Sequence, residues 1–204
     1  MKKYKIIYCD PPWQFSNKKT GGSMKSGAAH QYLTTGIEGL KRLDVNSIAA
    51  DNCLLVMWYV GAMPQEAIDL VNAWGFTLKN MNGFNWNKLT VSNKPFFGMG
   101  FWTRAGSESA IFAVKGKPKP ISHSVRAVGN YMPESLDDVL AELCFSGSYK
   151  VGKHSVKPIE FMGKCVELMG DVPRLEMFAR KRAKGWDLFG NEAPNSIDIK
   201  NKQG

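Results

Sequence analysis

The sequence predicts one α/β domain with three layers. Short apolar runs that favour strands alternate with amphipathic segments that favour helices, which is typical of a sheet covered by helices on both faces. The chain has 204 residues, 44% of them hydrophobic, so it is long enough for one full core, and it shows no internal repeat. We therefore expect a single domain over 1–195, followed by a polar and frayed tail over 196–204.

Strands are predicted where apolar runs stop at proline, glycine or polar residues. The first run, KIIYC at 5–9, stops at Asp10-Pro11-Pro12, and CLLVMWYV at 53–60 is typical of a buried central strand. Four shorter candidates follow at 84–87, 110–114, 175–179 and 186–189.

Four helices are predicted, at 37–50, 64–74, 135–144 and 158–169. The second begins with Pro64 and is followed by Gly75, which is the usual asymmetry of helix ends. The third can be capped by Ser135, with Asp137 and Asp138 at the positive end of its dipole.

The composition limits the functional classes. The net charge is +9, which favours a polyanionic partner, although a basic solvated surface explains the same charge. No apolar run approaches the ~20 residues that cross a bilayer, and the N-terminal apolar stretch is too short for a signal peptide. A cytoplasmic protein is expected (in the host cytoplasm if phage-encoded), acting as a monomer or homodimer. The four cysteines lack metal-ligand spacing, so free thiols and no metal are expected.

The tetrapeptide Asp10-Pro11-Pro12-Trp13 follows the first predicted strand, where ligands bind in α/β sheets. Prolines fix φ and lack an N–H, so they hold the nearby carbonyls rigidly. The Asp10 carboxylate and the Pro11 carbonyl offer two acceptors for the N–H groups of an exocyclic amine, which would draw the lone pair back onto nitrogen. Trp13 offers a flat face for an unstacked base. A tight turn with an aromatic plug explains these residues equally well.

This tetrapeptide and several later motifs resemble the MT-A type of adenine-N6 methyltransferases, of the small phage and bacterial branch. The motifs follow the family's order over most of the chain: DPPW at 10–13, Trp58 within the second apolar run, WGF at 74–76, GFWTR at 100–104, Glu108, GKP at 116–118, HSVKP at 154–158, LEMFAR at 175–180, GW at 185–186 and GNE at 190–192. A second HSV at 123–125 lacks the lysine and proline that follow in the family motif.

The resemblance implies a circularly permuted, Rossmann-like fold with a mostly parallel seven-stranded sheet and one reversed strand. It also implies transfer of a methyl group from S-adenosyl-L-methionine to N6 of a flipped-out adenine, with Asp10, Pro11, Pro12 and Trp13 as the catalytic residues. A small, solitary, basic chain favours DNA as the substrate. RNA remains an alternative, as does a catalytically silent nucleic-acid-binding subunit.

The cofactor site is also predicted from the resemblance. Lys157, just before a predicted helix, suits the methionine carboxylate. Asn191 and Glu192 follow a strand and suit the ribose hydroxyls, and Phe178 and Arg180 shape the pocket. The complete set comprises Cys9, Asp10, Lys157, Glu176, Phe178, Arg180, Asn191 and Glu192. The Gly-x-Gly-x-Gly sequence of many methyltransferases is missing after 175–179, as is usual in the family that the chain resembles.

Nucleic-acid contacts are predicted for Lys115, Lys117 and Lys119, which glycine and proline separate, with Arg104 and Arg126 as weaker candidates. A solvated loop is the alternative explanation. The glycine-, serine- and lysine-rich segment 18–29 is predicted to be a mobile lid, and 130–150 contains an insertion.

Other reactions are disfavoured by missing features. Methylation at the cytosine ring carbon needs a cysteine after a proline, and the chain has no such pair. Enzymes that methylate the cytosine amino group usually carry serine where Asp10 stands. No phosphate-binding loop or dinucleotide fingerprint is present either.

Overall fold

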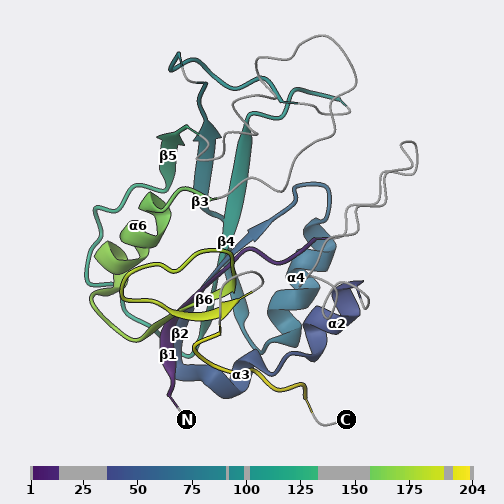
Figure 1. Cartoon of the computed structure of the whole chain (residues 1–204), viewed down its shortest axis with the longest axis vertical. Helices are drawn as coiled ribbons and strands as arrows, with labels where there is room; N and C mark the ends of the chain where they lie inside the picture. The colour runs from purple at the N-terminus through teal and green to yellow at the C-terminus, as the bar shows by residue number, and fades with distance from the viewer. Residues whose placement is uncertain are drawn as a thin grey trace.

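The computed structural model describes residues 2–13, 36–90, 92–98, 102–132, 157–190 and 195–202. In this part of the chain seven strands form one sheet in the order β5-β3-β4-β2-β1-β6-β7 (Figure 1). The strands are β1 Tyr4–Cys9, β2 Ala49–Tyr59, β3 Thr77–Lys88, β4 Ser107–Lys115, β5 Val128–Tyr131, β6 Arg174–Ala179 and β7 Asp187–Gly190. Only β4 runs antiparallel to its neighbours, so the predicted mostly parallel sheet with one reversed strand is confirmed.

Helices cover both faces of the sheet, as predicted for three layers. One face carries α2 (Gly36–Arg42), α3 (Val45–Ile48) and α4 (Pro64–Ala73), and the other carries α6 (Glu160–Met169), on opposite sides of the sheet in Figure 1. Successive side chains of a strand point to opposite faces. Ile7 of β1 therefore packs with the α4 side, whereas Ile6 and Tyr8 pack with Phe161 of α6.

The predicted helix over 37–50 is two helices in the structure. Asp44 interrupts it because its side chain accepts a hydrogen bond from the Ser47 amide at 3.2 Å and caps a new helix. The backbone is then extended from Ala49, so β2 begins earlier than the apolar run predicts. The helices α4 and α6 lie where their patterns predict them, and Gly75 after α4 has a φ of 80° that a larger residue adopts only with strain.

The sequence pattern does not predict the full extent of two strands at one side of the sheet. β3 extends over Thr77–Lys88, far beyond the predicted 84–87, although its first half is polar. Pairing with β4 stabilises this half, with register shifts between Leu78 and Phe84. β5 is only four residues long and is held by parallel pairing with β3. Backbone pairing thus determines these strands more than hydrophobic periodicity does.

The C-terminal segment packs onto the domain, in contrast to the frayed tail that its polar composition predicts. Ile199 is buried, Asn201 forms a bridge with Leu43, and the Lys202 amide donates to the Arg42 carbonyl at 2.8 Å. The predicted lid over 18–29, the helix over 135–144 and most of the insertion over 130–150 lie outside the described residues. Among the described helices, none is long and apolar enough to cross a membrane.

Candidate active site

Three strands, β1, β3 and β4, and the residue Lys157 just before α6 bring charged groups together at one edge of the sheet. Parallel strands β1 and β2 end side by side here, with Cys9 paired to Met57, and Asp10 follows directly. The reversed strand β4 begins at the same edge, which places Glu108 there, and β3 ends there at Lys88. This is the carboxyl edge of the parallel strands, where ligands bind in open α/β sheets.

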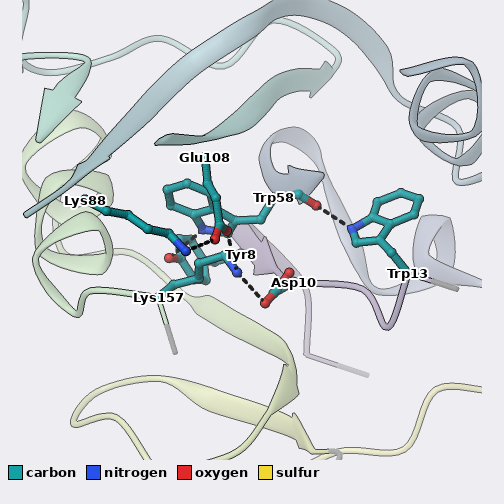
Figure 2. A network of polar contacts seen from close by, with 7 residues as sticks. All are labelled: Tyr8, Asp10, Trp13, Trp58, Lys88, Glu108 and Lys157. Atoms are coloured by element: carbon teal, nitrogen blue, oxygen red, sulfur yellow. Dashed lines mark hydrogen bonds and ion pairs between the residues drawn. The ribbon is translucent and has the colours of Figure 1, made fainter. Parts of the chain in front are cut away.

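The charged groups form a continuous network (Figure 2). The Lys157 Nζ lies 2.9 Å from Asp10 Oδ2 and 2.9 Å from Glu108 Oε2, and the Lys88 Nζ lies 2.6 Å from Glu108 Oε1. The side chain of Lys157 is only 11% exposed, and its ammonium group lies 5.7 Å from the centre of the Trp58 ring. Positive and negative groups alternate along the network, which offsets the cost of removing them from water.

The electrostatics keep this network ionised. Burial by itself would raise the pKa of Glu108, but Lys157 and Lys88 outweigh it and hold that pKa below its usual range. Burial would likewise lower the pKa of Lys157, yet Asp10 and Glu108 raise it well above the usual lysine value. Lys157 is therefore a permanent cation at neutral pH and fixes the orientation of the Asp10 carboxylate.

A chain of hydrogen bonds braces the motif against the sheet. The Trp13 indole N–H donates to the Trp58 carbonyl at 3.0 Å, and the Trp58 indole N–H donates to the Tyr8 hydroxyl at 2.7 Å. Within the turn, the Trp13 amide donates to the Pro11 carbonyl at 2.8 Å. Trp13 is nearly fully buried on the α2 and α4 side. The indole anchors the turn and lines a cavity of about 160 Å³ together with Pro12 and Glu66. Its role as a stacking face for a base stays a prediction.

A cavity of about 150 Å³ lies beside Asp10 on the α6 side of the sheet. Its lining combines carboxylates, cations and apolar groups: Tyr8, Asp10, Lys157, Ile159, Met162, Glu176, Phe178, Arg180, Lys181, Arg182 and Ala183. Glu176 pairs with Tyr8 across the β1–β6 register. Its burial, with a smaller contribution from Asp10, raises its pKa to about 7.

Phe178 reaches this cavity through an irregular backbone. Its φ is 63°, a left-handed value that is uncommon outside glycine, and the β6–β7 register shifts between Met177 and Ala179. Such bulges redirect side chains and are frequent next to active sites. The Phe178 ring also contacts Phe189 of β7 edge-on at 6.2 Å, so it forms a firm apolar wall.

Five of the eight predicted cofactor residues line this one cavity: Asp10, Lys157, Glu176, Phe178 and Arg180. The side chain of Cys9 does not. It is fully buried on the α4 side, because strand residues alternate and its neighbours Tyr8 and Asp10 take the cavity side. Asn191 and Glu192 lie outside the described residues.

The predicted nucleic-acid residues are widely separated. Lys115 ends the nine-residue strand β4, which at about 3.3 Å per residue places it roughly 25–30 Å from the strand's start near Glu108. There the Lys115 Nζ donates to the Asn46 carbonyl at 3.1 Å, and Lys117 and Lys119 follow on the same far edge. Arg126 is exposed beside α6, where its carbonyl accepts a hydrogen bond from Lys164. Of the five, only Arg104 lies in the connection between β3 and β4, at the edge of the sheet that carries Asp10 and Glu108.

Some residues of the network were missed from the sequence. Lys88 and Tyr8 belong to no predicted site, and Glu108 entered only as part of a family motif. Lys88 follows a polar stretch that predicts no long strand, so its position at a strand end was hidden. Lys181 and Arg182, which line the cavity, directly follow the predicted strand 175–179, and that position is the signal that identifies them. No cluster of metal-ligating side chains occurs among the residues described.

The sheet order, the reversed strand and the cavity at the strand ends fit the Rossmann-like fold of methyltransferases. Comparison with known families gives the finer assignment: the family model of MT-A70 matches residues 4–192, and the chain belongs to this family.

Curated relatives agree with this assignment. The type II methyltransferase M.MunI of a Mycoplasma species is 31% identical over 97% of this chain and 82% of its own length. The N(6)-adenine-specific methyltransferase METTL4 of Homo sapiens is 26% identical over 94% of the chain, and METTL4 of Mus musculus is 23% identical. The chain matches 38% of the length of either METTL4 protein.

Proposed function

We propose that this protein transfers a methyl group from S-adenosyl-L-methionine to N6 of adenine in DNA. The observation that carries the proposal is the placement of Asp10. Its carboxylate is held at 2.9 Å by a buried lysine, at the rim of a cavity and next to two prolines. The N(6)-adenine-specific relatives support adenine as the target base, and the similarity to a type II methyltransferase supports DNA.

The turn provides the two acceptors that an adenine amine needs. Lys157 occupies Oδ2 of Asp10, and the carboxylate has a second oxygen and further lone pairs. The Pro11 carbonyl already accepts from the Trp13 amide and retains its other lone pair. When both acceptors bind the N–H groups of the amine, they concentrate its lone pair on nitrogen. Asp10 is then the group placed to receive the proton that the methylated nitrogen releases.

The cavity residues fit S-adenosyl-L-methionine, which supplies the methyl group when bound. The molecule carries a carboxylate, cationic centres, ribose hydroxyls and a flat base. Lys157, predicted to hold the methionine carboxylate, already pairs with Asp10 and Glu108. Arg180 and Lys181 offer further positive charge for that carboxylate, and the acidic Glu176 suits hydroxyl or ammonium groups. Phe178 and Met162 offer apolar contacts for the base. Asn191 and Glu192 remain predicted ribose ligands.

A direct test combines the protein with methyl-labelled S-adenosyl-L-methionine and with unmethylated DNA or RNA. We expect label in DNA, recovered as N6-methyldeoxyadenosine by nucleoside mass spectrometry, and at least about a hundredfold less label with the Asp10→Ala variant. Label in RNA alone would show that the substrate is RNA and not DNA. Nucleic-acid binding without any label would indicate the catalytically silent binding subunit.

A further inference from the structure

The connection between β3 and β4 leaves the sheet directly beside the ion network. We call its described residues, 89–90, 92–98 and 102–106, the β3–β4 hairpin. Its first arm begins right after Lys88, and its second arm ends just before Ser107 and Glu108. In Figure 1 the hairpin extends from the top of the sheet beyond β3 and β4. A molecule that reaches Asp10 from this edge therefore meets the hairpin.

Backbone hydrogen bonds and close contacts between its two arms hold the hairpin in shape. The Gly98 amide donates to the Ala105 carbonyl at 2.9 Å, and the Phe96 amide donates to the Lys88 carbonyl at 3.0 Å. A Cβ on Gly98 would lie 2.2 Å from the Ala105 carbonyl oxygen, and one on Gly106 would lie 2.8 Å from the Phe96 carbonyl oxygen. The two arms approach each other so closely that only glycine fits at these positions.

This braced element exposes aromatic and cationic side chains. Trp102 is 99% exposed and Phe97 is 60% exposed, and the Arg104 guanidinium lies 5.1 Å from the centre of the Phe97 ring. Lys94 is also exposed. The stretch 89–106 contains no acidic residue. Such an aromatic and basic surface is complementary to a polyanion whose flat groups can stack.

We propose, building on the proposed function, that the β3–β4 hairpin binds the nucleic acid next to the target adenine. Trp102 stacks on a base beside the vacated position, and Arg104 pairs with a backbone phosphate. A base that leaves the duplex loses its stacking partners, and an aromatic side chain at the same edge as Asp10 can replace one of them. The hairpin, rather than the far-edge lysines, is then the main DNA contact near the reaction.

The test measures binding of a fluorescein-labelled DNA duplex of mixed sequence by fluorescence anisotropy. We expect Trp102→Ala to weaken binding by about tenfold, the scale of one lost stacking contact, and Trp102→Phe to retain most of the affinity. Arg104→Gln should reduce the salt slope by about one unit. Ile121→Ala is the matched control, because Ile121 is 71% exposed but lies beside the end of α6 away from this edge, and it should bind normally.

Equal affinity of Trp102→Ala and the parent protein would overturn the proposal. So would a change in sedimentation with unchanged DNA affinity, because Trp102 would then contact a second copy of the chain. The binding assay needs no methyl transfer, so the two proposals fail separately. Binding that depends on Trp102 without methylation overturns the proposed function alone, whereas methylation with Trp102-independent binding overturns the role of the hairpin alone.

Discussion

Lysines lie at both ends of the reversed strand β4 but differ in what they contact. At its first end Glu108 joins Lys88 and Lys157 in a half-buried network that includes Asp10. At its other end Lys115 donates to backbone carbonyls and the neighbouring lysines face solvent. Burial and opposed charges hold the first group in one geometry, whereas the second group has no carboxylate partner in a described ion pair. Basic residues in the sequence therefore do not identify the functional edge, and strand direction does.

The largest expected effect comes from the catalytic edge. Replacing Asp10 with alanine should reduce methyl transfer by at least about a hundredfold, the usual scale for losing a preorganised polar group. Cofactor affinity, measured by calorimetry, should change much less. Near-normal transfer by this variant would show that the turn is not the reaction centre.

Glu108→Gln tests whether the network acts as a unit. The change removes the carboxylate that Lys88 and Lys157 both contact, at 2.6 Å and 2.9 Å. We expect the rate of methyl transfer to fall by about tenfold or more, through misplacement of Asp10. Glu38→Gln is the matched control, because Glu38 pairs with Lys41 on the exposed helix α2, and it should leave the rate unchanged. Equal rates for both variants would limit Glu108 to a structural role.

The pH dependence tests Glu176 within the cavity. Its pKa of about 7 lies above the ordinary value of 4.5, so the folded protein favours the protonated form. As the pH rises from about 4.5 through 7, ionisation of Glu176 should therefore lower the stability of the ligand-free protein. Affinity for the cationic cofactor should rise over pH 6–8, and Glu176→Gln should flatten this profile. A wild-type affinity independent of pH in this range would remove Glu176 from the cofactor site.

The smallest effect is expected at the far edge. Replacing Lys115, Lys117 and Lys119 together by glutamine should change the salt slope of DNA binding by less than Arg104→Gln does, since Lys115 lies roughly 23 Å along β4 from Glu108 and the other two lysines follow the end of that strand. The salt dependence of duplex binding measures both variants. A loss of about two to three slope units in the triple variant would restore the sequence-based prediction and extend the DNA path across the sheet.

The sequence predicts the core elements well because their apolar runs are buried on both sides, as in β1 and β2. The sequence pattern fails where strand pairing or a single polar contact determines the backbone conformation. Examples are the polar strand β3, which pairs with β4, and Asp44, which caps a new helix. The cavity residues Lys157, Glu176 and Phe178 could be singled out from the sequence because they flank predictable elements and match family motifs. Lys88 was missed because its contact with Glu108 depends on the pairing of β3 with a reversed strand, which no local pattern encodes. The side of the sheet to which Cys9 points follows from the alternation of strand residues, once it is known that Asp10 faces the cavity.

Methylation of adenine in DNA is tested most directly by expressing the protein and its Asp10→Asn variant in a host that lacks adenine methylation, and by mapping N6-methyladenine in the host DNA. We expect methylated adenines within a defined sequence for the parent protein and none for the variant. Unmethylated DNA from cells that contain the folded parent protein, or equal methylation with the variant, would contradict this expectation.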